Sequence, residues 1–183
     1  MPRLTAYESP FQVSLKGVAA GLVGTLVMTS ALQAAARVLP APSSVQPDPD
    51  DYSDVGSLST LDEGQHVPPT EQVAARLATR LFGAELSPGN RQMLGAGIHW
   101  AYGAIWGALS AQIQLTLRPP AVPYGIALGI AVWMVGPGRL VPALGLYERP
   151  ASSGLARRVL AIGLHVVYGL STAVTLERLS SAR

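Results

Sequence analysis

The sequence predicts an all-α membrane protein with about four transmembrane helices, arranged as two tandem helical hairpins, and one additional amphipathic surface helix. Three observations predict this fold: four long runs without charged residues, a low overall charge, and one short amphipathic stretch between two of the runs. Only 13% of the 183 residues are charged, whereas soluble domains carry about 25%. We therefore expect a single membrane domain over residues 1–183.

The four uncharged runs are the predicted membrane spans, at about residues 17–36, 93–117, 121–138 and 159–176. Each is long enough for a bilayer crossing, which needs roughly 20 mostly apolar residues. None shows the charged stripe with a 3.6-residue period that a soluble helix exposes. Basic residues border the runs, as is typical of membrane boundaries; they are Lys16, Arg37, Arg91, Arg118, Arg139 and Arg158.

A polar loop over residues 40–91 separates the first two spans. Its first half, residues 40–64, is rich in Asp, Pro and Ser and has little that would form a core. Its second half predicts an amphipathic helix at about residues 70–82, with Thr70 as its N-cap. One face is apolar and another carries Arg76 and Arg80. Such a helix either lies on the membrane surface or packs over the ends of the spans.

The third span is expected to break at Gly136-Pro137-Gly138, because proline cannot continue the helical hydrogen bonds. The apolar segment that follows, up to residue 146, is too short to span a bilayer. Region 137–146 is therefore either a re-entrant segment or a segment packed against the bundle.

An internal repeat relates the two predicted hairpins. The pattern Gly-(Ile/Leu)-His-x-x-Tyr-Gly occurs at residues 97–103 and again at 163–169, in the second and fourth spans. The first and third spans share a Gly-x-x-x-Gly pair. Small residues with this spacing allow close helix packing, so we expect helix contacts at Gly17, Gly21, Gly103, Gly107, Gly125, Gly129 and Gly169.

The repeat places a histidine and a tyrosine inside each of two spans: His99 with Tyr102, and His165 with Tyr168. Ionisable residues inside a membrane are costly and are candidates for function. Four interpretations stay open: structural hydrogen bonds between helices, proton handling, ligation of one haem b by the two histidines, and binding of a metal by the pair. The spans hold no carboxylate to complete a metal site.

Other chemistry is not indicated. Without cysteine there is no disulfide, thiolate nucleophile or Cys-based metal site. The positive charges are not clustered, which argues against nucleic-acid binding. No nucleophile elbow or phosphate-binding loop is present in a suitable context. We therefore expect no catalytic residues, no metal, no cofactor and no enzyme activity.

Several short motifs together resemble the YagU-like family of bacterial inner-membrane proteins. They are Lys16-Gly17-x-x-Ala20-Gly21, Val67-Pro68-Pro69, His99-x-x-Tyr102-Gly103, Trp133 and Pro142-Ala143-Leu144-Gly145. The likeness covers residues 14–178, and the Asp- and Pro-rich loop is not matched. The resemblance implies a multi-pass protein of the inner membrane with a role in acid resistance, and it supplies no catalytic residues.

These observations predict a non-enzymatic, multi-span protein that supports membrane or acid-stress physiology. Its expected partners are the lipid bilayer and either further copies of itself or another membrane protein. The alternatives are a small transport or proton-conducting protein that uses the two histidines, and a bis-histidine haem b protein.

Overall fold

The computed structural model describes residues 9–38, 68–146 and 155–181, and every regular element in these ranges is helical. This confirms the predicted all-α class. The Asp- and Pro-rich loop over residues 40–64 lies outside the described residues. The elements are α1 (Pro10–Val38), α2 (Pro69–Phe82), α3 (Pro88–Leu117), α4 (Ala121–Trp133), η1 (Met134–Leu140), α5 (Val141–Ala143) and α6 (Leu155–Ser181).

Three of the described helices are long and apolar enough to cross a membrane: α1, the continuous stretch Ala121–Ala143, and α6 from Arg158 onward. They contain three of the four predicted spans. The remaining predicted span, residues 93–117, lies in α3, which has 30 residues. Helix α3 is long enough, but its glutamines, aromatic residues and His99 make it less apolar than the other three.

Local sequence signals set the helix ends. Ser9 and Gln12 form a reciprocal capping box at the start of α1. Ser87 caps α3 by accepting a hydrogen bond from the Asn90 amide. The expected cap at Thr70 is wrong: α2 begins at Pro69, and the Pro68 carbonyl accepts the Glu71 amide. Proline suits the first position of a helix because its missing N–H has no helical partner there.

Small residues occupy most of the buried positions of α1 and α3, larger residues such as Leu128, Tyr168 and Leu176 are buried on α4 and α6, and many large aliphatic residues are exposed. The buried positions of α1 are Gly17, Ala20, Gly21, Gly24 and Thr25. Large side chains on the long helices are exposed. They include Leu26 of α1 (55%), Ile105 and Leu109 of α3 (58% and 55%) and Val122 of α4 (59%). Monomeric soluble proteins rarely expose such continuous apolar surface, whereas hydrocarbon is a suitable solvent for it.

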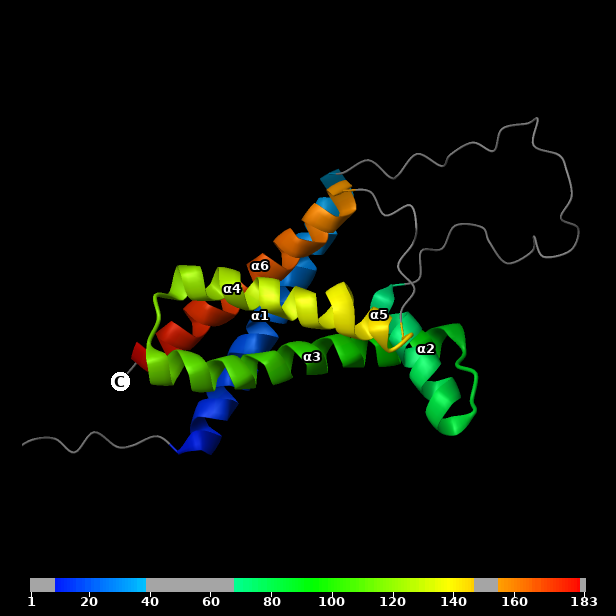
Figure 1. The fold of residues 1–183 in the computed structure, drawn as a ribbon, viewed down its shortest axis with the longest axis horizontal. Helices are drawn as coiled ribbons and strands as arrows, with labels where there is room; N and C mark the ends of the chain where they lie inside the picture. Colours follow the sequence, from blue (N-terminus) through cyan, green and yellow to red (C-terminus); the bar gives the residue numbers. More distant parts are fainter. Residues whose placement is uncertain (1–8, 39–67, 147–154, 182–183) are drawn as a thin grey trace, which may run out of the picture.

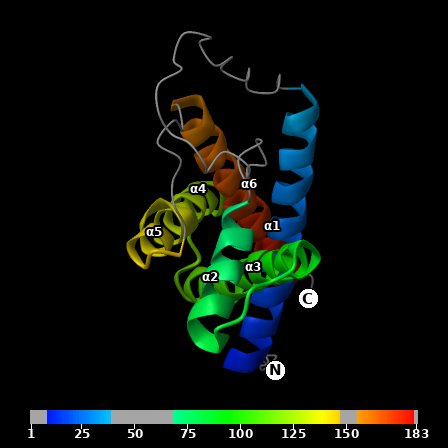
Figure 2. The ribbon, with the colours of Figure 1, turned by 90° about the vertical axis from the view of Figure 1, so that its right-hand side faces the viewer.

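The helices pack as antiparallel neighbours. Helix α1 packs extensively against both α3 and α6, and α4 packs against α6. Figure 1 shows α3 and α4 running across the view, with α1 and α6 oblique to them. The view turned by 90° shows the same crossing, with α1 upright beside α6 (Figure 2). Helix α1 therefore lies between α3 and α6.

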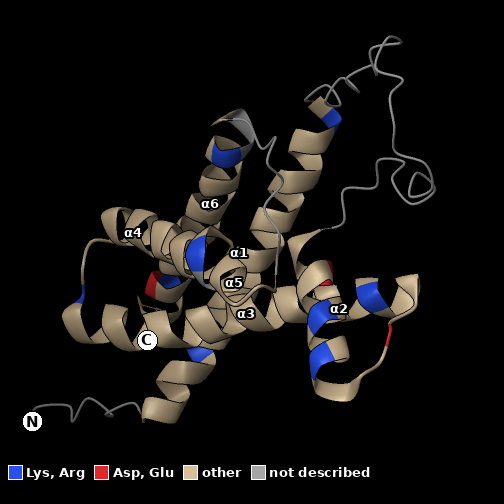
Figure 3. Cartoon of the chain, turned by 45° about the vertical axis from the view of Figure 1, so that its right-hand side comes forward, with Lys and Arg blue, Asp and Glu red and all other residues tan. Residues whose placement is uncertain are grey.

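Charged side chains are concentrated toward the helix ends. Figure 3 shows the central turns of the long helices largely free of charge. Several arginines gather on and near α2. Because α1, α3, α4 and α6 run in alternating directions, the C-terminal end of α1, the N-terminal ends of α3 and α6, and η1 lie at the same end of the bundle.

Candidate functional site

The α1–α3 interface is a glycine seam. A Cβ atom added to Gly21 would collide with the Gly103 carbonyl oxygen, and one added to Gly107 would collide with Gly17 and Gly21. Thr25 continues this face of α1 and contacts Gly103. All four glycines are among the predicted contact residues, and they allow the two backbones to touch.

The α4–α6 interface is built in the same way. Gly125 meets the Gly169 carbonyl and the Leu170 backbone, where an added Cβ would lie 2.7 Å from the Leu170 Cα. Gly129 meets the backbone of His165 and Val166. The predicted glycines therefore line both seams, and Gly129 meets Gly169 as well as the His165 backbone.

The two seams are equivalent in a register that differs from the sequence repeat. Gly107 packs between Gly17 and Gly21 in the way that Gly169 packs between Gly125 and Gly129. The repeat motif instead pairs Gly103 with Gly169. The geometric correspondence is thus displaced by four residues, or one helical turn, from the correspondence that the motif indicated. His99 and His165 are consequently not at equivalent positions of the two seams.

Both motif tyrosines bond to the backbone of another helix. Tyr168 is 2% exposed, and its hydroxyl donates to the Gly103 carbonyl at 2.7 Å. The Tyr102 hydroxyl donates to the Val132 carbonyl of α4 at 2.9 Å. Its ring also makes an edge-to-face contact with Trp106, with 6.2 Å between centroids. These tyrosines join α6 to α3 and α3 to α4.

The Tyr102 bond lies where the predicted break occurs. Gly136 has non-helical dihedral angles (φ −76°, ψ −106°), and the chain continues through the π-helix η1. The Tyr102 hydroxyl, which donates to the Val132 carbonyl in the last turn of α4, lies against Gly136. The third span is therefore kinked but continuous up to Ala143.

Sequence reasoning missed a third tyrosine. The Tyr124 hydroxyl donates to the Ser110 carbonyl at 3.0 Å, which gives α3 and α4 a second hydrogen bond near their connecting turn. These two helices otherwise make little contact. The sequence shows only that a tyrosine stands at the start of an apolar run. It does not indicate which carbonyl accepts the hydrogen bond.

The two histidines have separate partners. His99 Nε2 lies 3.4 Å from the Thr29 hydroxyl of α1. His165 Nδ1 lies 2.7 Å from the Ala161 carbonyl of its own helix. Both side chains are partly buried, and neither bonds to the tyrosine of its own motif. The described residues include no group of three or more His, Cys, Asp or Glu side chains suited to a metal ion.

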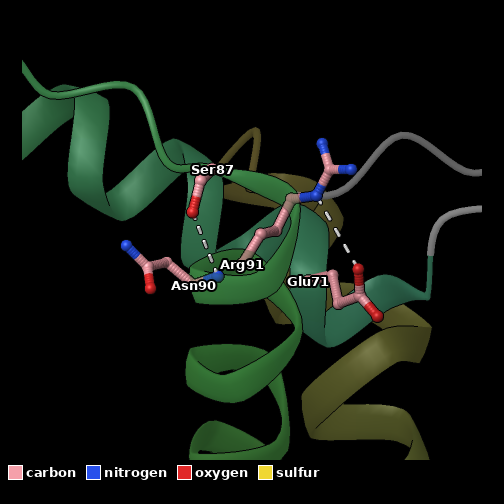
Figure 4. A network of polar contacts seen from close by, with 4 residues as sticks. All are labelled: Glu71, Ser87, Asn90 and Arg91. Atoms are coloured by element: carbon pink, nitrogen blue, oxygen red, sulfur yellow. Dashed lines mark hydrogen bonds and ion pairs between the residues drawn. The ribbon is translucent and has the colours of Figure 1, made fainter.

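Helix α2 packs over the N-terminal end of α3, which is one of its two predicted placements. Val73, Ala74 and Ala78 are its buried residues. Glu71 lies against Gly95 and forms an ion pair with Arg91 at 3.7 Å, beside the Ser87 cap (Figure 4).

The arginines of α2 reach region 137–146. Arg80 donates to the Leu144 carbonyl at 2.8 Å, and Arg76 donates to the Gly145 carbonyl. Gly145 has a positive φ of 62°, as is usual just after a helix end. Positive side chains stabilise the free carbonyls at such an end. The end of the short helix α5 is therefore held by the arginine side chains of α2.

Comparison with known protein families, with curated proteins and with solved structures finds no match to this chain.

Proposed function

We propose that this chain is a non-enzymatic, multi-pass protein of a bacterial inner membrane, in which α3 is the fourth span. The observation that carries the proposal is the distribution of side-chain size. Glycine, alanine, serine and threonine make up most of the buried positions of α1 and α3, and large aliphatic side chains face outward from all four long helices. Exposed Ile105, Leu109 and Ile113 give α3 the same kind of outer face.

The use of the intramembrane polar groups supports a role without catalysis. The hydroxyls of Tyr102, Tyr124 and Tyr168 are each donated to a backbone carbonyl of a neighbouring helix. Such bonds orient helices and leave the hydroxyls engaged. The proposed role is support of membrane or acid-stress physiology, through lipid and through self-association or a membrane protein partner, as the likeness to the YagU-like family implies.

Fractionation and acid survival test this proposal. We expect the expressed chain to stay with bacterial membranes in alkaline carbonate and to be released by detergent, because its exposed aliphatic surface needs an apolar solvent. Deletion of the gene should lower survival at acid pH, and the intact gene should restore it. A compact monomer in the aqueous fraction would contradict the membrane assignment, and unchanged survival would contradict the stress role.

Proton conduction by His99 and His165 is the rival hypothesis. Liposomes that contain the purified chain distinguish the two: under our proposal their proton flux equals that of empty liposomes. A flux that disappears in the His99→Ala/His165→Ala variant would favour the rival. A Soret absorption band in the purified protein would favour the haem alternative.

A further inference from the structure

The kinked third span carries a shallow groove on its outer side. Met134, Val135, Arg139 and Ala143 line a space of about 420 Å³. Met134 and Val135 are 43% and 40% exposed, and Arg139 is the single charged side chain of the lining. An acyl chain fits such a surface, because three of the four lining residues are apolar.

Contacts from elsewhere in the chain fix the backbone at Gly136 and just beyond Ala143. The non-helical backbone of Gly136 changes the direction of the span beside Val135, and Tyr102 packs against that glycine. Beyond Ala143, Arg76 and Arg80 bind the carbonyls of Leu144 and Gly145. These contacts hold the stretch of backbone that carries the four lining residues.

The charge around the groove determines which lipid suits it. Among the side chains that the structure describes, its end of the bundle carries six arginines against two glutamates: Arg37, Arg76, Arg80, Arg91, Arg139 and Arg158, with Glu71 and Glu85. Glu71 is paired with Arg91. Basic side chains near a membrane surface attract anionic headgroups, and an arginine matches phosphate oxygens in charge and geometry.

We infer that this groove binds one anionic phospholipid, with its phosphate at Arg139 and an acyl chain along Met134, Val135 and Ala143. The inference rests on the proposed membrane location.

Native mass spectrometry of the full chain in neutral detergent tests the inference. The probes are phosphatidylglycerol, phosphatidylcholine and inorganic phosphate. We expect retained phosphatidylglycerol to exceed phosphatidylcholine. Arg139→Gln should lower phosphatidylglycerol affinity about fivefold, the loss expected for one basic side chain near an anionic lipid, and Arg139→Lys should keep most of the preference.

Two variants separate the groove from general charge. Arg37→Gln removes one charge from the same end but outside the groove, and it should change affinity less than twofold. Ala143→Trp fills the groove, keeps Arg139 and should weaken binding of both lipids, provided that its thermal melting in detergent matches the parent protein.

Three results would overturn the inference: equal losses in Arg139→Gln and Arg37→Gln, binding of inorganic phosphate as strong as that of phosphatidylglycerol, or no preference between the two lipids. Any of these in a chain that needs detergent for extraction would refute the lipid site alone. A chain that leaves the membrane without detergent would refute the proposed location instead.

Discussion

At the scale of single residues, the intramembrane tyrosines act as hydrogen-bond donors to backbone carbonyls. Tyr102 and Tyr124 both connect α3 to α4, at different places. Tyr102 donates to the Val132 carbonyl near the end of α4, next to the kink at Gly136. Tyr124 donates to the Ser110 carbonyl inside the regular helix α3.

These two hydrogen bonds predict similar effects of two matched substitutions. Tyr102→Phe and Tyr124→Phe should each lower the free energy of unfolding by about 0.6 kcal/mol, the average for a hydrogen bond between membrane helices. Unfolding in mixed detergent micelles measures both. A loss of about 2 kcal/mol or more in Tyr102→Phe alone would contradict this, because it would mean that the Val132 carbonyl has no other donor.

The two histidines differ in whether their polar partner belongs to another helix or to their own. His99 connects α3 to α1 through Thr29, while His165 bonds within α6. Their shared motif therefore does not produce a shared role. A short motif specifies residue types, but the neighbouring helix decides which partner each side chain meets.

At the scale of elements, glycine determines where helices touch. Gly21 has the Gly103 carbonyl immediately beside it, whereas Gly97 on α3 has no atom within 4 Å of an added Cβ. The two glycines thus offer a matched test of packing against helix propensity.

Gly21→Ala should destabilise the bundle by about 1–3 kcal/mol, because the new methyl group forces the α1–α3 seam apart. Gly97→Ala should be neutral or stabilising by up to about 1 kcal/mol, since alanine is the better helix former. Gly129→Ala should behave like Gly21→Ala, because its seam is equivalent. Thermal unfolding in detergent measures all three. If Gly21→Ala unfolds at the same temperature as the parent protein, α1 and α3 have room for a methyl group at this position and do not pack as closely as we infer.

At the scale of the whole molecule, the number of spans follows from whether α3 crosses the bilayer. Its ends lie at Pro88 and Leu117, so Ala84 and Pro119 sit just beyond opposite ends. The chain contains no cysteine, which makes single introduced cysteines unambiguous reporters.

We expect Ala84→Cys and Pro119→Cys to react with a membrane-impermeant maleimide from opposite faces of the membrane. Helix α3 runs antiparallel to α1 along a shared seam, so we expect it to cross if α1 crosses. Labelling in intact cells and in inverted vesicles compares the two faces. If both sites react from the same face, α3 does not cross the membrane, and only the three most apolar helices remain as spans.

The sequence by itself determined the class and the positions of the helices. Long uncharged runs and the Gly-Pro-Gly irregularity act through local composition and backbone geometry, so they were readable without a partner, whereas the predicted cap at Thr70 was wrong. The glycine faces were readable too, because only close packing explains small residues at that spacing.

Only the tertiary structure decided the partners. It displaced the repeat by one turn, gave Tyr102 the Val132 carbonyl, revealed Tyr124, and placed Arg76 and Arg80 on the end of α5. Each of these pairs contacts across a separate helix, and a contact between helices depends on their crossing and rotation. Local sequence does not encode either quantity, since both arise from packing the entire bundle.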